Sequence, residues 1–217
     1  MIRRFATLAA AAIVLAAAPA FAANPQVELD TTLGKIRIEL YPEAAPKTVA
    51  NFLDYVKAKY YDGMQFHRVI DGFMVQAGGF TSEFKTRPTR PPVVNEAESS
   101  SKAGIVNASG TIAMARTSDP NSATAQFFIN VADNKALNFR SPDPGGIGYT
   151  AFGKVVEGMD VVNKIAKVPK GGGKPVPPGT PLSPADVPTE PIVIKTARLI
   201  EPTKSDAPAA PAPTPAK

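Results

Sequence analysis

Alternation of apolar and charged side chains is the feature that most restricts how this sequence can fold. Between Lys35 and Leu40, Ile36 and Ile38 alternate with Arg37 and with a glutamate. A period of two is typical of a half-buried β-strand. Seven further stretches have strand character: residues 27–29, 66–70, 74–78, 111–115, 126–131, 151–155 and 192–199. The sequence therefore predicts a mainly β protein.

Helical periodicity is found in only two places. Pro46 suits the first position of a helix, and apolar residues follow it with the spacing of one helix face: Val49, Phe52, Leu53 and Val56. Residues 158–165 fit a second, shorter helix. Because long strand–helix–strand alternation is missing, we expect an antiparallel sheet, most simply a closed barrel with helices over its ends. Residues 170–190 are rich in Gly and Pro and are expected to form an irregular surface loop.

The two ends of the chain differ from its middle. Residues 1–22 contain two arginines, then an apolar run, then Ala20-Phe21-Ala22, which is the pattern of a cleaved secretory signal peptide. A retained membrane anchor is the alternative, but the apolar run at 5–18 is short for about 30 Å of hydrocarbon. We expect cleavage near Ala22, one domain at 23–202, and a disordered tail rich in Pro and Ala at 203–217.

Composition excludes several classes of function. The chain has no cysteine, so it can form no disulfide and can use no thiol nucleophile. Its one histidine, His67, excludes multi-histidine metal sites and weakens any catalytic-triad hypothesis. The formal net charge is +5, but the lysines are scattered rather than clustered with aromatic residues. A nucleic-acid partner is therefore disfavoured.

An arginine stands among apolar residues in the predicted hairpin at 66–79. Strict alternation places Phe66, Arg68 and Ile70 on one face of its first strand. A buried guanidinium needs partners, so such a position is unusual. A structural ion pair or a side chain that reaches solvent would explain Arg68 without any function, and a site residue is the other reading.

A second unusual face lies in the strand predicted at 126–131. Alternation directs three apolar side chains toward the core: Phe127, Ile129 and Val131. The opposite face combines an aromatic ring with two amides: Gln126, Phe128 and Asn130. This mixture suits neither a core nor a plain surface, and it is compatible with the wall of a groove.

These residues belong to five blocks that together resemble a cyclophilin-type peptidyl-prolyl cis-trans isomerase. The blocks are FHRVI at 66–70, GFMVQ at 72–76, GTIAMA at 110–115, QFFI at 126–129 and AFGKV at 151–155. The resemblance extends from about Gln26 to Pro202, and the bacterial exported (periplasmic) cyclophilins are the most similar members. It implies an eight-stranded antiparallel barrel with two capping helices and an external groove for an extended peptide centred on proline.

The resemblance also implies the roles of individual residues. It assigns the catalytic guanidinium to Arg68. It assigns substrate binding to Phe73, Met74, Gln76, Ala115, Arg116, Thr117, Gln126, Phe128, Leu137 and Tyr149. The proline pocket within this set is formed by Phe73, Met74, Phe128 and Leu137, and the backbone of 115–117 pairs with the peptide.

The sequence departs from the pattern of many eukaryotic members at three positions. Ala136 replaces a tryptophan, so we expect weak cyclosporin binding. Tyr149 stands where many members have histidine. Arg116 stands where many have asparagine, which adds a charge to the rim of the groove.

The function implied is isomerisation of Xaa-Pro bonds in exported, folding proteins by a monomer that needs no cofactor and no metal. Its partners would be proline-containing peptides and unfolded exported chains, in the periplasm, without membrane attachment once the signal peptide is cleaved. A binding module or chaperone could use the same groove without catalysis. A structural, envelope-tethering role is supported only by the tail rich in Pro and Ala.

Overall fold

The computed structural model describes residues 23–171 and 182–200. The expected signal peptide at 1–22, the tail at 203–217 and the middle of the loop expected at 170–190 lie outside the described residues. Within these ranges, no helix has the length and apolar character needed to cross a membrane.

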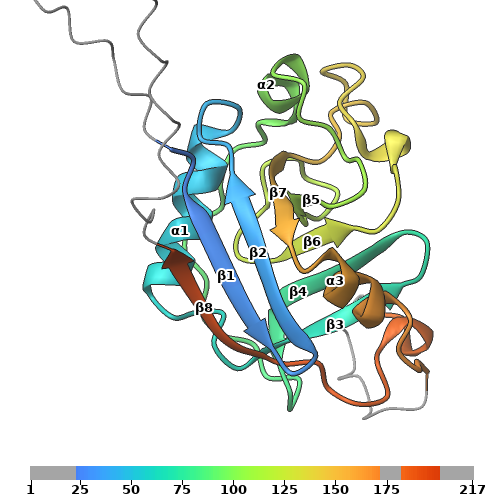
Figure 1. Ribbon diagram of the computed structural model, residues 1–217. Coiled ribbons are helices and arrows are strands. Elements are labelled where there is room, and N and C mark those ends of the chain that lie inside the picture. Colours follow the sequence, from blue (N-terminus) through green and yellow to red (C-terminus); the bar gives the residue numbers. More distant parts are fainter. Residues whose placement is uncertain (1–22, 172–181, 201–217) are drawn as a thin grey trace, which may run out of the picture.

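Eight strands form one sheet in which all neighbours are antiparallel, which confirms the mainly β prediction. The order across the sheet is β3-β4-β6-β5-β7-β2-β1-β8 (Figure 1). The strands are β1 Gln26–Thr31, β2 Gly34–Leu40, β3 Met64–Ile70, β4 Met74–Thr81, β5 Thr111–Met114, β6 Phe127–Asn130, β7 Ala151–Glu157 and β8 Ile194–Ile200.

The prediction of a closed barrel is wrong, because the sheet is open between its edge strands β3 and β8. The two edges meet through a single bridge between Gln65 and Val193. Backbone hydrogen bonds from Phe66 N–H to Ile192 O (2.8 Å) and from Gly63 N–H to Ile194 O (2.7 Å) flank this bridge. Register shifts along β3 present an uneven row of backbone groups, so no continuous ladder joins β3 to β8.

Three α-helices accompany the sheet, one more than the sequence predicted. They are α1 Pro46–Lys57, α2 Ala97–Lys102 and α3 Met159–Ala166, and short 3-10 turns η1 and η2 occur at Lys135–Leu137 and Pro184–Asp186. Helix α2 has the sequence AESSSK, which lacks an apolar stripe and so gave no periodic signal. Figure 1 shows α1 behind the β1–β8 side of the curved sheet and α3 beside β2 and β4.

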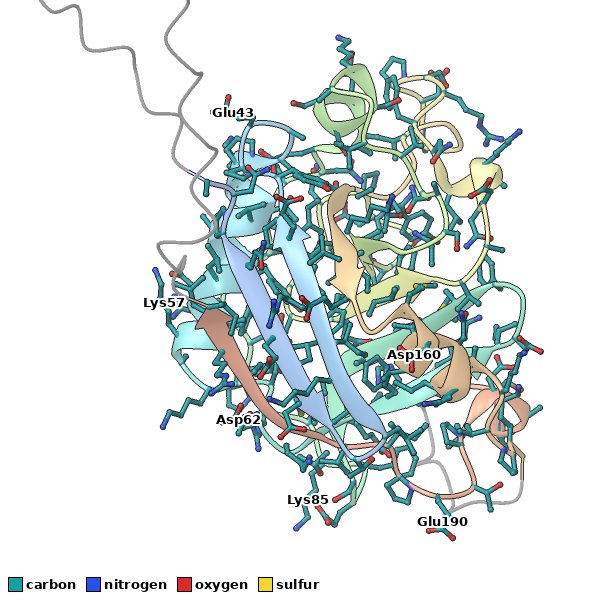
Figure 2. The ribbon with its side chains drawn as sticks, in the orientation of Figure 1. Glu43, Lys57, Asp62, Lys85, Asp160 and Glu190 are labelled. Carbon is teal, nitrogen blue, oxygen red and sulfur yellow. The ribbon has the colours of Figure 1, made fainter. Side chains whose placement is uncertain are left out.

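The main core fills the inside of the curved sheet. Helix α1 buries Val49, Phe52 and Val56 there, and α3 buries Val162 and Ile165. The start of α1 is fixed from outside the helix, because the Glu96 carboxylate accepts hydrogen bonds from the first free backbone amides of α1. Charged side chains labelled in Figure 2, such as Glu43, Lys57 and Lys85, project outward.

Candidate active site

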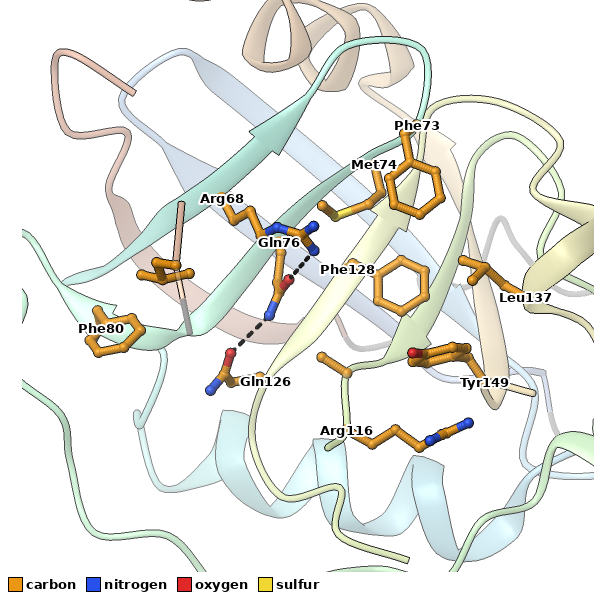
Figure 3. A pocket seen from close by; sticks show the side chains of 12 residues that line it. Arg68, Phe73, Met74, Gln76, Phe80, Arg116, Gln126, Phe128, Leu137 and Tyr149 are labelled. Atoms are coloured by element: carbon orange, nitrogen blue, oxygen red, sulfur yellow. Dashed lines mark hydrogen bonds between the residues drawn. The ribbon is translucent and has the colours of Figure 1, made fainter. Parts of the chain in front are cut away.

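A pocket of about 250 Å³ opens on the side of β4 and β6 that faces away from the main core (Figure 3). Ten of the eleven predicted site residues line it; Thr117 does not. The lining consists of Arg68, Phe73, Met74, Gln76, Phe80, Ala115, Arg116, Gln126, Phe128, Leu137, Tyr149 and Leu182. The fold therefore brings residues from distant parts of the sequence to one place.

A row of directly paired residues forms the floor of the pocket. Arg68 on β3 pairs with Gln76 on β4, Gln76 pairs with Phe128 on β6, and Phe128 pairs with Ala113 on β5. Directly opposite residues in antiparallel strands carry their side chains on the same face. Strand register thus places a cation, an amide and an aromatic ring side by side.

An irregularity in β3 is responsible for the orientation of Arg68. Strict alternation predicted that Phe66 and Arg68 share a face, and this is wrong. Phe66 pairs with Ala77 and lies in the main core, whereas Arg68 pairs with Gln76 and lines the pocket. The register shift between Phe66 and Arg68 sets two residue steps on β3 against one on β4, which turns the later residues to the other face.

A chain of polar contacts crosses one side of the pocket. The Arg68 Nε lies 3.3 Å from Oδ2 of Asp186, and Arg68 Nη1 lies 3.5 Å from Oε1 of Gln76. Gln76 Nε2 in turn donates to Oε1 of Gln126 at 2.9 Å. A side chain on Gly79 would collide with Gln126, so glycine at this position leaves room for that amide. The Arg68 guanidinium is therefore contacted from two sides, by Asp186 and by Gln76. Figure 3 shows the contacts from Arg68 to Gln76 and from Gln76 to Gln126.

An apolar cluster forms the other side of the pocket, and we call it the groove cluster. Its buried members are Met74, Ala113, Phe128 and Ala151, and partly exposed side chains pack around them: Ile70, Phe73, Ile105, Ala115, Leu137 and Tyr149. Phe128 is only 4% exposed and meets the Tyr149 ring edge-on at 5.8 Å. The ring is thus packed against the fold as well as turned toward the pocket.

The rim of the pocket carries Arg116, whose guanidinium lies 4.4 Å above the Tyr149 ring. Its Nε donates to the carbonyl of Gly148 at 3.0 Å. Thr117 is exposed outside the pocket, where its backbone N–H and its hydroxyl both contact Ser122 Oγ. The Thr117 hydroxyl therefore takes part in hydrogen bonds within a local turn.

His67 is fully buried and does not line the pocket. Its ring meets Phe80 edge-on at 5.0 Å. Burial lowers the pKa of His67 from 6.5 to about 4, so the ring is neutral at pH 7. The residue next to Arg68 thus supports the pocket wall as an uncharged group.

Sequence reasoning missed three residues at the site: Phe80, Leu182 and Asp186. Phe80 continues the alternation of Met74 and Gln76 along β4, so a longer predicted strand would have included it. Leu182 and Asp186 come from the segment expected to be an irregular loop, where no periodic pattern indicates direction. Among the described residues, no group of three or more His, Cys, Asp or Glu side chains could hold a metal ion.

Comparisons with known proteins agree with this arrangement. The family model for "Cyclophilin type peptidyl-prolyl cis-trans isomerase/CLD" matches residues 26–199. The chain is 49% identical over 174 residues to the peptidyl-prolyl cis-trans isomerase cyp18 of Streptomyces antibioticus, covering 80% of this chain and 98% of that relative. It is 48% identical over 199 residues to peptidyl-prolyl cis-trans isomerase A of Dickeya dadantii, covering 89% of this chain and 97% of that relative.

A comparison with solved structures finds the same fold. The crystal structure of a cyclophilin-type peptidyl-prolyl cis-trans isomerase from Cryptosporidium parvum matches with a TM-score of 0.63 at 23% identity, covering 83% of this chain and 99% of that chain. At this identity the match concerns the fold alone. The match to the family model and the identity to the two bacterial relatives show that the chain belongs to the cyclophilin-type peptidyl-prolyl cis-trans isomerase family.

Proposed function

We propose that the protein accelerates rotation about Xaa-Pro bonds in peptides bound along the pocket, with Arg68 as the catalytic residue. One observation carries the proposal: the Arg68 guanidinium lies beside the apolar groove cluster in a pocket of about 250 Å³. Membership of the isomerase family and the identity to named isomerases support it.

The chemistry follows from the electronic structure of the peptide bond. Amide resonance gives prolyl rotation a barrier of about 18–20 kcal/mol. At half rotation the resonance is lost, and the proline nitrogen becomes pyramidal and regains a lone pair. A guanidinium that donates to this nitrogen stabilises the twisted state more than either planar isomer. No proton is transferred, and arginine suits the role because it keeps its charge.

The remaining residues of the pocket hold the substrate while the bond turns. Phe73, Met74 and Phe128 provide apolar contacts for the proline ring. The Gln76 amide lies beside Arg68 and can bind a neighbouring carbonyl. Arg116 makes no backbone–backbone hydrogen bond to any described residue, so its main chain is available to pair with an extended peptide.

Replacement of Arg68 by alanine tests the proposal directly. We expect R68A to lower kcat/KM about 100-fold, equivalent to about 3 kcal/mol of transition-state stabilisation, with little change in thermal stability. The assay is protease-coupled or NMR-exchange isomerisation of a short Xaa-Pro peptide. R90A is the matched control, because Arg90 forms a half-exposed ion pair with Asp54 and does not line the pocket. Near-native activity of R68A would refute the mechanism.

The same assay separates the enzyme from a binding module. A module would bind proline peptides in an NMR titration without accelerating exchange between their isomers. The Arg68–Gln76 contact supports catalysis, because simple binding of an apolar ring needs no cation. Peptide binding by the native protein without rate enhancement would make the binding module the better description.

We further propose that the enzyme acts in the periplasm on exported, folding proteins, and two features of residues 1–22 support this. They are the arginines followed by an apolar run and the Ala20-Phe21-Ala22 sequence. Mass spectrometry of the protein isolated from its own cells should find a mature start at or near Ala23. An intact Met1 in the membrane fraction would instead support a retained anchor. A cell without a periplasm would secrete the protein or hold it at the wall.

A further inference from the structure

A carboxylate from a distant part of the chain contacts the catalytic arginine. Asp186 ends the short turn η2 (Pro184–Asp186), and its Oδ2 lies 3.3 Å from the Arg68 Nε. The side chains of Arg68 and Asp186 are 34% and 26% exposed, so the pair is partly shielded from solvent. Among the salt bridges of the described residues, this is the one that involves a residue lining the pocket.

The two contacts of Arg68 fix the orientation of its planar group. Asp186 accepts from Nε on one edge of the guanidinium, and Gln76 lies at Nη1. Contacts at two different nitrogens restrict rotation of the planar guanidinium about its long axis. Nη2 makes no hydrogen bond to a described residue, so this nitrogen is left for an incoming group.

The turn that carries Asp186 is itself anchored in the fold. Val187, the next residue, is 3% exposed and packs in a small cluster with Phe80 and Phe84. The Val187 carbonyl accepts from the Gly171 N–H at 3.0 Å, and the Asp186 N–H donates to the Ser183 carbonyl at 3.0 Å. The carboxylate is thus presented by a docked turn rather than by a free loop.

We propose that Asp186 is a positioning residue for isomerisation, which holds the Arg68 guanidinium in the orientation that donates to the substrate. This inference rests on the proposed function of Arg68. The arginine side chain has four rotatable bonds, and without a partner it would adopt orientations that do not reach the proline nitrogen. The contact with Asp186 should therefore stabilise the transition state more than it strengthens substrate binding. A partly exposed pair of this kind contributes little to folding stability.

Kinetic constants of Asp186 variants test the proposal. We expect D186A to lower kcat about fivefold while KM changes less than twofold, because the orientation of the guanidinium matters at the twisted state. D186N keeps an oxygen acceptor at the same place and should restore kcat to within about twofold of the native value. E190A is the matched control, because Glu190 is an exposed acid of the same segment that does not line the pocket (Figure 2).

A double-mutant cycle shows whether Asp186 acts through Arg68. In the R68A background, D186A should cause no further loss of kcat. The proposal is overturned if D186A has native kcat, if it raises activity, if only KM changes, or if the loss persists in R68A. The proposed function is tested separately. If the native protein had no isomerase activity, Arg68 would have no catalytic role. Thermal unfolding should place D186A close to the native protein, and a large loss of stability would indicate a structural role instead.

Discussion

Two apolar clusters lie on opposite faces of the same strands, and the adjacent residues Phe127 and Phe128 belong to different ones. Phe127 is fully buried in the main core, where Phe52 and Tyr61 meet its ring at 5.5 and 5.3 Å. Phe128 is 4% exposed in the groove cluster, which is open to the pocket. The exposed fraction alone does not distinguish the two rings. Other aromatic rings surround Phe127, whereas Phe128 borders the open pocket.

The same strands therefore have a packed core on one face and the pocket proposed for substrate on the other. The main core is surrounded by side chains of strands and of helices α1 and α3. The groove cluster has partly exposed members such as Phe73 and Leu137 along its open side. We therefore expect truncation in the main core to cost folding free energy alone, whereas truncation in the groove cluster costs both stability and activity. The following predictions test this division.

Truncation of the Phe127 ring should have the largest effect. F127A leaves a cavity that the surrounding rings cannot fill, and we expect a loss of about 3–5 kcal/mol in the free energy of unfolding. Urea denaturation measures this loss. The fraction that remains folded should keep near-native kcat/KM, because Phe127 does not line the pocket. Strong loss of activity in fully folded F127A would show that the two clusters are not independent.

His67 should make stability depend on pH by the next largest amount. Its pKa is about 4 in the folded protein against 6.5 as the ordinary value, so between these values the unfolded chain binds more protons. The free energy of unfolding should therefore fall as pH is lowered from about 6.5 to about 4, by about 3 kcal/mol in total, and be constant above that window.

The substitution H67Q isolates this contribution from the titrating carboxylates. The difference in unfolding free energy between the native protein and H67Q should shrink as pH falls through the window, and urea denaturation at several pH values measures it. A difference that stays constant from pH 7 to pH 4 would show that His67 has the same pKa in the folded and unfolded chains.

Truncation of Phe128 should lower stability less than truncation of Phe127 does, and should lower activity more. We expect F128A to lose about 2–3 kcal/mol of unfolding free energy, less than F127A, because side chains on the open side can relax into the space. Its kcat/KM should fall about tenfold or more, since the proline ring loses one wall. If F128A is the more destabilised variant and isomerises normally, the division between core and groove is wrong.

Much of the fold and of the pocket could be predicted from the sequence, and the limits have physical causes. Strand-like patterns located all eight strands, and the family resemblance assigned ten residues that line the pocket. The opposite orientations of Phe66 and Arg68 could not be predicted, because a bulge depends on pairing with β4. Asp186 could not be predicted either, since its contact with Arg68 joins residues that are 118 positions apart.

The smallest expected effect concerns the charged residue that borders the groove cluster. The Arg116 guanidinium stacks on Tyr149, and Tyr149 packs edge-on against Phe128, so a cation at the surface supports this apolar cluster from outside. Stacking of this kind at an exposed site contributes about 0.5–1 kcal/mol. We expect R116Q to lower the unfolding free energy by about that amount and to raise KM about two- to threefold, with kcat nearly unchanged, because the Tyr149 wall becomes less ordered. Urea denaturation and isomerisation kinetics measure the two effects. R140Q is the control, because Arg140 is an exposed arginine that binds the Gly145 carbonyl and does not line the pocket. A native KM in R116Q would show that the groove cluster, like the main core, holds its shape without a partner at the surface.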